Sequence, residues 1–196
     1  HKPLACCIRS KLRQNPVDFG YCTATVSCHN DAVESYARQL LAASAYTGIV
    51  GIEFKYDDTA DEYKLIEINT RPVNTTGISI GCGVNLPLIA FRDAIGEKQE
   101  PITDWQDGVI WLWLSMDFSA ARQLRRLGKI TYREWLQSIR GKRVHPILAG
   151  DDLRPFILYY GSYFSRQLSR AFASTRVPHL ARDMMRGLGR AATRIW

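Results

Sequence analysis

The alternation of apolar and polar residues predicts a pair of neighbouring strands between Gly48 and Pro72. Apolar residues with high β-propensity form two short runs, at residues 49–54 and at residues 65–68. Between the two runs, residues 57–62 (DDTADE) have the composition of a turn and almost nothing to bury. We therefore predict a β-hairpin that closes around this turn.

The predicted hairpin brings acidic side chains of both strands together. When it closes around residues 57–62, Glu53 lies opposite Glu67. Because side chains alternate along a strand, Glu67, Asn69 and Arg71 then share one face with Leu65. One face of the hairpin is therefore expected to present two carboxylates, an amide and a guanidinium.

Two carboxylates that face each other across a strand pair repel, and in a half-buried place each raises the pKa of the other. A shared cation relieves this repulsion. Together with the amide oxygen of Asn69, the carboxylates are hard oxygen ligands, which suit Mg²⁺ that holds a substrate phosphate. The alternative interpretation is a solvated face whose acids are neutralised by Lys55 and Lys64.

The rest of the chain mixes strand and helix patterns. We predict further strands at residues 3–8, 21–28 and 109–114, and helices at residues 31–44, 86–95 and 119–127 and between Thr131 and Gly141. Asn30 or Asp31 is expected to cap the first helix, and Thr131 with Glu134 has the spacing of a capping box. This mixture favours an α+β fold.

Three basic residues alternate at strand spacing directly after the first predicted strand. Arg9, Lys11 and Arg13 are expected to point the same way, toward a phosphate or a carboxylate substrate. The alternative is a solvated edge strand protected by its charges.

Composition narrows the class of protein. A hydrophobic fraction of 46% is typical of a globular core, and no apolar run approaches the ~20 residues of a spanning helix. We find no signal peptide. The five cysteines include no CxxC pair, and we expect them to be free thiols of a reducing cytoplasm rather than nucleophiles.

Charge divides the chain into two parts. Up to Phe118 there are 10 Lys and Arg and 15 Asp and Glu, a net charge of −5; from Ser119 onward there are 16 and 4, a net charge of +12. In the tail, residues 159–196, arginines recur every four residues from Arg182 to Arg194, which predicts a basic amphipathic helix. This helix would meet an anionic membrane, an acidic partner or nucleic acid, or else pack as a solvated helix on a larger protein.

The run GIEFKYD…YKLIEINTRP resembles the metal-binding strands of the ATP-grasp ligases, in their carboxylate–amine ligase branch. The resemblance covers residues 3–91 and extends more loosely to Pro155. It implies that Glu53, Glu67 and Asn69 hold the magnesium (or manganese) ions that bridge the phosphates of ATP, the co-substrate. It also implies that Arg71 is a catalytic residue near the transferred phosphate.

The same resemblance makes the basic strand KLRQNP a border of the active site, with Lys11 and Arg13 as contacts to the cofactor. It implies an α+β lobe of antiparallel sheet and packed helices, followed by a mostly helical, basic extension. We divide the chain accordingly into residues 1–97, 98–158 and 159–196, as C-terminal lobe, extension of that lobe and basic tail.

The activity implied is that of an ATP- and magnesium-dependent cytoplasmic ligase, which activates a small carboxylate as an acyl phosphate and joins it to an amine. The lysine-bearing nucleotide lobe of the family is expected upstream of His1, and we expect the isolated chain to bind ATP poorly. Two alternatives belong to other classes. One is a non-catalytic ATP-grasp-like binding module; the other is a protein that associates with membranes or nucleic acid through its basic tail.

Overall fold

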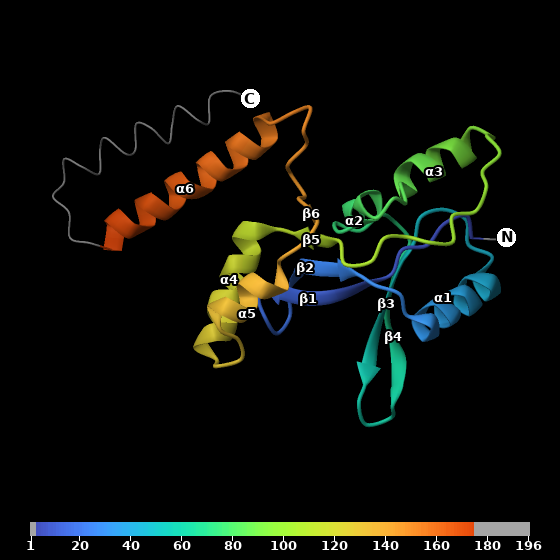
Figure 1. The fold of residues 1–196 in the computed structure, drawn as a ribbon, viewed down its shortest axis with the longest axis horizontal. Coiled ribbons are helices and arrows are strands. Elements are labelled where there is room, and N and C mark those ends of the chain that lie inside the picture. Colours follow the sequence, from blue (N-terminus) through green and yellow to red (C-terminus); the bar gives the residue numbers. More distant parts are fainter. Residues whose placement is uncertain (1–2, 175–196) are drawn as a thin grey trace. The chain divides into compact units, whose positions relative to one another are not determined.

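Two sheets form the framework of the structure, a computed structural model that describes residues 3–174 (Figure 1). One is a four-stranded sheet of order β1-β2-β5-β6, and the other is the hairpin β3-β4. Neighbouring strands are antiparallel except for β5 and β6, which are parallel. The strands are β1 (Arg9–Asn15), β2 (Tyr21–Ser27), β3 (Gly51–Asp57), β4 (Glu62–Asn69), β5 (Ile110–Leu112) and β6 (Arg143–Val144).

Helices occupy the segments between these strands and follow the last of them. They are α1 (Asp31–Ser44), α2 (Gly77–Gly81), α3 (Leu86–Ala94), α4 (Leu114–Arg126), α5 (Tyr132–Ser138) and α6 (Arg154–Ser174). The predicted α+β fold is confirmed. The chain forms two compact units, His1–Pro146 and Ile147–Trp196. The three-part division predicted at residues 97 and 158 stays a prediction.

Local sequence signals set several helix ends as predicted. The Asn30 side chain accepts a hydrogen bond from the Val33 backbone N–H at 3.0 Å and caps α1. At the start of α5, Thr131 and Glu134 form the predicted capping box, in which each side chain accepts from a backbone N–H of the other residue. These caps satisfy N–H groups that the first helical turn leaves without a partner.

Two predictions of element position are wrong, and one short helix is absent from the prediction. The strand expected at residues 3–8 is reduced to one isolated bridge between Ala5 and Ile102, and regular pairing begins at Arg9. Helix α2 was not predicted, and α4 begins at Leu114 rather than Ser119. The apolar run at residues 109–114 predicts a strand over its whole length, because periodicity cannot separate a short buried strand from the first turn of a buried helix.

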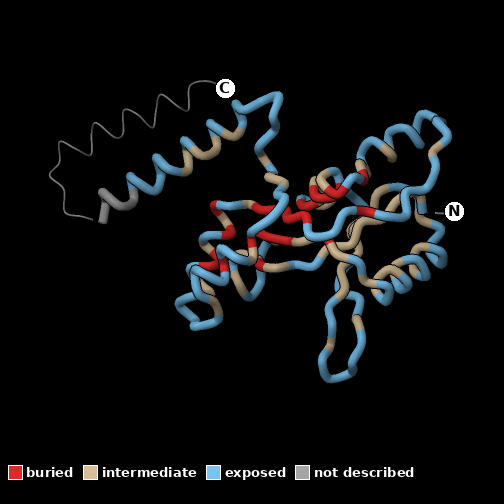
Figure 2. Tube along the Cα trace, viewed as in Figure 1, coloured by how far each residue is buried: buried red, intermediate tan, exposed pale blue. Residues whose placement is uncertain are grey.

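The four-stranded sheet is buried on both faces at its centre, in β5 and most of β2, and this is where the core lies (Figure 2). The outer strands β1 and β6 are mostly not buried. Ile110 and Leu112 of β5 pack with Ala121 of α4 and Trp135 of α5 on one side. The alternate residues Val109 and Trp111 pack on the other side, with buried residues of α2 and of the segment that follows it. A strand buried on both faces is apolar at every position, as β5 is.

The hairpin lies outside this core, and none of its residues is buried. Its β3 face toward α1 is apolar, and the rings of Phe54 and Tyr36 approach to 6.2 Å between centroids. The hairpin therefore presents its second face, which carries Glu53, away from this contact.

The tail prediction falls partly outside the described residues. Arg182, Arg186, Arg190 and Arg194 all lie beyond residue 174, so the predicted basic helix there has no structural description. The part of the tail that is described belongs to α6. Within residues 3–174 we find no helix with both the length and the apolarity that crossing a membrane requires.

Candidate functional site

The two predicted carboxylates are paired across the hairpin. The register places Glu53 directly opposite Glu67, as the sequence predicted. Directly opposed residues of an antiparallel pair project to the same face with their Cα atoms about 5 Å apart. The hairpin is closed, and both acids lie at its end nearer the rest of the chain rather than at its turn. The two carboxylates therefore lie on the same face, directly opposite each other, as two ligands of a shared cation must.

A bulge changes which neighbours share the face of Glu67. The pairing shifts between Glu53 and Phe54, so that Phe54 pairs with Leu65 and Ile66 is the extra residue. An extra residue reverses the alternation beyond it. The prediction that Leu65 shares a face with Glu67 is therefore wrong, and Leu65 joins the apolar face with Phe54.

A lysine already contacts one of the two carboxylates. The Lys11 ammonium of β1 donates a hydrogen bond to Glu53 Oε1 at 2.5 Å. Both side chains are partly open to solvent, with exposed fractions of 39% for Lys11 and 45% for Glu53. The contact joins the four-stranded sheet to the hairpin, so the carboxylate pair and the basic strand belong to one site.

Asn69 and Arg71 complete the set of predicted site residues. Asn69 ends β4 opposite Gly51, and its alternation with Glu67 places it on the same face. Because residue 51 has no side chain, nothing from β3 occupies the position across from Asn69. Arg71 lies beyond the strand, is exposed, and donates from Nη1 to the Pro72 carbonyl at 3.2 Å.

The donor set fits a hard divalent cation. Two carboxylates and an amide oxygen on one face are oxygen ligands of the kind that Mg²⁺ takes, with water or phosphate oxygens completing its shell. Among residues 3–174, no three His, Cys, Asp or Glu side chains are grouped to hold a metal ion. A site here would therefore depend on Glu53 and Glu67 together with Asn69 and oxygen atoms of a substrate.

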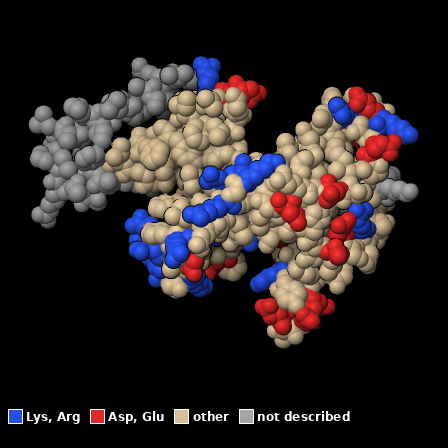
Figure 3. Space-filling model, viewed as in Figure 1, with Lys and Arg blue, Asp and Glu red and all other residues tan. Residues whose placement is uncertain are grey.

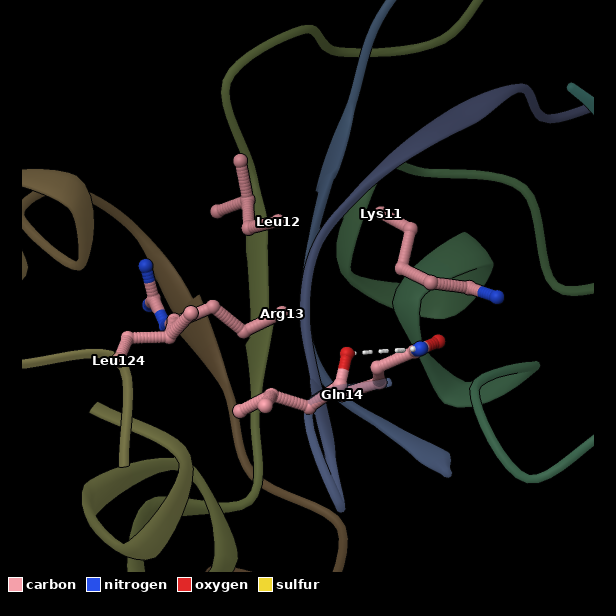
Figure 4. Close-up of a pocket in the computed structure, with 6 residues that line it drawn as sticks. Lys11, Leu12, Arg13, Gln14 and Leu124 are labelled. Atoms are coloured by element: carbon pink, nitrogen blue, oxygen red, sulfur yellow. Dashed lines mark hydrogen bonds between the residues drawn. The ribbon is translucent and has the colours of Figure 1, made fainter. Parts of the chain in front are cut away.

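Arg13 does not lie on the face of Lys11. A bulge at Leu12 shifts the register, so that Lys11 pairs with Thr25 and Arg13 with Ala24. Consecutive residues of β2 face opposite sides, and the two basic side chains therefore extend to opposite sides of β1 (Figure 4). The prediction that Arg9, Lys11 and Arg13 point the same way is wrong for this reason.

The Arg13 guanidinium is instead part of a buried network. Its Nε and Nη2 donate to the two carboxylate oxygens of Asp117 at 2.8 and 3.0 Å, and its Nη1 donates to Ser138 Oγ at 2.7 Å. Asp117 also accepts from Thr23 Oγ1 at 2.9 Å and from Trp135 Nε1 at 2.7 Å. The network ties β1, β2, α4 and α5 together, and Arg13 is engaged there rather than facing a cofactor.

The pattern of residues around Asp117 does not predict a role for this acid. A signal for it existed, because an acid inside an otherwise apolar segment is rarely buried without a charged partner. The Asp117 side chain is fully buried, and that of Arg13 is 5% exposed. The identity of the partner, 104 positions away along the chain, could only come from the tertiary structure.

A small hollow lies beside β1, and Figure 4 draws the residues that line it. It has a volume of about 260 Å³. Its lining comprises Lys11, Leu12, Arg13, Gln14, Val17 and Leu124. The Gln14 amide donates to the backbone carbonyls of Val17 and Asp18 at 3.1 and 2.8 Å, which fixes the loop that borders the hollow. The hollow adjoins Lys11 and so extends the site along β1.

Burial favours the protonated form of four of the cysteine thiols. Burial raises the pKa of Cys7 to about 12, with further contributions from the neighbouring Cys82, and burial raises the pKa of Cys22 to about 11. Burial also raises the pKa of Cys6 and of Cys28. A thiol must ionise to act as a nucleophile, so these groups are poor candidates for covalent catalysis.

A second polar cluster fixes the end of β2. The His29 ring stacks on Trp105 with 4.2 Å between centroids, and its Nδ1 and Nε2 lie 2.8 Å from Asp107 and 3.3 Å from Asp104. The hydrogen bond to Asp107 is the main cause of a raised pKa at His29. The imidazolium form therefore links the end of β2 to the segment before β5.

We expect His29 to stabilise the fold more in acid than in base. Because its pKa is raised in the folded chain, the contribution is fully present below the unfolded value of about 6.5 and is lost as the pH rises through the folded pKa. Replacing His29 by Asn should therefore lower the urea midpoint more at about pH 5 than at about pH 8.5. His145, whose pKa is lowered by burial, is present in both proteins and cancels in the difference.

An NMR titration checks the same cause directly. Asp107→Asn should lower the pKa of His29 by more than Asp104→Asn does, because Asp107 makes the shorter contact. In the urea measurement, an equal loss of stability for His29→Asn at both pH values would show that the stacked ring acts through packing alone.

The chain is an ATP-grasp protein, since a family model of this superfamily matches residues 6–116, more than half of its length. That family is described as ATP-grasp in the biosynthetic pathway with Ter operon, and the chain belongs to it. The resemblance predicted from the hairpin motif is thereby confirmed, and the domain is of the ligase type that binds ATP. No curated protein matches the chain.

Proposed function

We propose that the chain carries the metal- and phosphate-binding part of a ligase that activates a carboxylate with ATP and joins it to an amine. Family membership supports the ligase class, and the description of the family supports a biosynthetic role. The observation that carries the proposal is the direct opposition of Glu53 and Glu67 on one face of the hairpin, with Asn69 beside them.

The proposed roles follow from the chemistry of each side chain. Glu53, Glu67 and Asn69 would hold Mg²⁺ or Mn²⁺, which when bound neutralises charge on the phosphates of ATP. Lys11 lies against Glu53 and would contribute a positive charge to the phosphate groups. Arg71 is exposed at the end of β4 and would orient the transferred phosphate or the substrate carboxylate through its planar donors.

In the proposed reaction, the substrate carboxylate attacks the γ-phosphorus of ATP, and ADP leaves. The amine then attacks the carbonyl carbon of the acyl phosphate, and inorganic phosphate leaves with the C–O bond electrons. The protein contributes position and charge rather than a covalent intermediate of its own. Free cysteines among the described residues support placing this reaction in a reducing cytoplasm.

Binding of Mn²⁺ tests the metal site without any need to know the substrate. We expect the chain to bind Mn²⁺ in a titration followed by electron paramagnetic resonance, and Mg²⁺ to compete for the same site. If Mg²⁺ does not displace the bound Mn²⁺, the proposed magnesium site is contradicted.

Isotope transfer tests the reaction. With the complete enzyme and a panel of ¹⁸O-labelled carboxylates and amines, ATP should yield ADP, and one ¹⁸O atom should pass from the carboxylate to phosphate. Formation of AMP and pyrophosphate would indicate an acyl adenylate instead and would contradict the proposed chemistry.

A further inference from the structure

A basic surface covers the outer faces of α4, α5 and the turn between them. It consists of Arg122, Arg125, Arg126, Lys129, Arg133 and Arg140, all of them exposed. Figure 3 shows basic side chains gathered over the region where Figure 1 draws these two helices. Between Ser119 and Arg140 the sequence contains these six basic residues and a single acid, Glu134.

The two helices are held rigidly beneath this surface. Ala120 and Ala121 of α4 and Trp135 of α5 are buried, so part of the apolar surface of each helix is packed into the core. Arg122 and Arg126 are four residues apart on one helix, and neighbours at this spacing lie on the same side about 6 Å apart along the axis. Four of the six charges therefore stand on packed helices, while Lys129 lies in the turn between them and Arg140 follows α5.

The positive charge of this surface is not compensated within the described part of the chain. None of the six side chains forms an ion pair there with Asp or Glu. Glu134 is committed to the capping box, where its Oε2 accepts from the backbone N–H of Thr131 at 2.7 Å. Arg125 lies 4.6 Å above the ring of Tyr132, which leaves its charge intact.

Compensation of the helix dipole explains only part of this pattern. Arg125 and Arg126 occupy the last turn of α4, where cations are favourable. That account does not extend to Arg133, which lies in the first turn of α5, where a cation opposes the dipole. A surface that gathers like charges at the end of α4 and at the start of α5 attracts external anions, which reduce the repulsion between its cations.

We propose that the basic surface of α4 and α5 binds the phosphodiester backbone of nucleic acid. Five of its six cations are arginines, whose planar donors suit phosphate oxygens, and the closely spaced phosphates of a duplex can meet several of these cations at once. The contact is with the backbone, so no base sequence is selected.

Two other occupants fit less well. An interfacial membrane helix inserts an apolar face; in α4 and α5 much of that face is used by the core, while Phe118, Leu127 and Leu136 stay exposed, so the vesicle measurement below tests this occupant. The acidic hairpin turn of a second copy of the chain is the other occupant. Two of its acids are already paired, since Asp57 and Glu62 lie 2.6 and 3.9 Å from the ammonium of Lys64.

Fluorescence anisotropy with a labelled mixed-sequence duplex of about 20 base pairs tests the proposal on the full chain. The variant is Arg122→Gln, Arg126→Gln and Arg133→Gln. The matched control is Arg38→Gln, Arg92→Gln and Lys98→Gln, which removes the same charge from exposed sites elsewhere. Because both triple variants keep the basic tail, their difference reports on the surface alone.

We expect the surface variant to bind at least about tenfold more weakly than the control at 0.1 M salt. Its slope of log K against log salt should become shallower by about 0.9 for each phosphate that the variant no longer neutralises. A single-stranded RNA of equal length should show the same ranking. Equal affinities of the two triple variants would overturn the proposal. So would binding to phosphatidylglycerol vesicles that depends on these arginines while binding to the nucleic acids does not.

Discussion

Replacing Glu67 by Gln is expected to weaken Mn²⁺ binding by at least about tenfold, since loss of even an outer-shell partner of a metal costs that much. The amide keeps one oxygen donor but removes the negative charge. Glu53 then remains as the one carboxylate of the pair, and Lys11 already lies 2.5 Å from it. Turnover of the complete enzyme should fall by well over tenfold for the same reason.

The same hairpin offers a matched control. Glu62 is also an exposed residue of β4, but it faces Asp57 at the turn rather than Glu53. Glu62→Gln should leave the Mn²⁺ affinity unchanged. Both variants should keep the circular dichroism spectrum and the melting temperature of the parent, because exposed substitutions of this kind change stability by about 0.5 kcal/mol or less.

Equal affinity of the Glu67 and Glu62 variants for Mn²⁺ would contradict the assignment of the hairpin face as a metal site. A fall in both would point instead to general attraction by the acidic hairpin. The two outcomes separate a specific pair of ligands from a diffuse negative field.

Replacing Asp117 by Asn is expected to cause the largest loss of stability, about 3–5 kcal/mol, because the guanidinium of Arg13 is left buried without its counter-charge. For a chain of this length, this corresponds to a fall in melting temperature of about 6–20 °C. Asn also loses an acceptor for Thr23 or Trp135, whose donors point at the same two oxygens. Denaturant unfolding followed by tryptophan fluorescence measures the change.

A double replacement shows whether the loss comes from the broken pair. Arg13→Met with Asp117→Asn removes both charges and should be more stable than Asp117→Asn alone, because no buried cation is left without its anion and the Asn oxygen still accepts from Thr23 or Trp135. Asp93→Asn, at an exposed position of α3, is the control for loss of a carboxylate. If Asp117→Asn unfolds at the same denaturant concentration as Asp93→Asn, the network does not stabilise the fold.

The network also links stability to the candidate site. Arg13 and Lys11 flank the bulge at Leu12, and the bulge turns one side chain into the core and the other toward Glu53. Anchoring of Arg13 by Asp117 therefore fixes the register of β1 at the position that presents Lys11.

The hairpin shows how far the sequence predicts the site. Its turn, its two strands and the opposition of Glu53 and Glu67 follow from local signals, because a polar turn between two apolar runs permits few alternatives. The bulge at Ile66 could not be predicted, since an extra residue leaves no mark in the alternation of so short a strand. It is the bulge that keeps Leu65 on the apolar face.

The basic strand shows where prediction from the sequence ends. Regular alternation places Lys11 and Arg13 together, whereas their partners, Glu53 and Asp117, are 42 and 104 positions away. Whether a basic side chain of β1 points toward the hairpin or into the core depends on the contacts that the folded chain makes. Burial of Arg13 in the core is favourable only because Asp117 lies there as its anion. No signal within β1 carries that information.

The sequence by itself determined the α+β class, the caps of α1 and α5, the hairpin and the pair of acids that indicate an ATP-grasp ligase. These features depend on contacts between residues close together in the chain, for which spacing and residue type suffice. Only the tertiary structure decided that Lys11 meets Glu53, that Arg13 is buried against Asp117, and that the cations of α4 and α5 form one surface. Such contacts join distant segments, and their free energies depend on the burial and the charge of both partners at once.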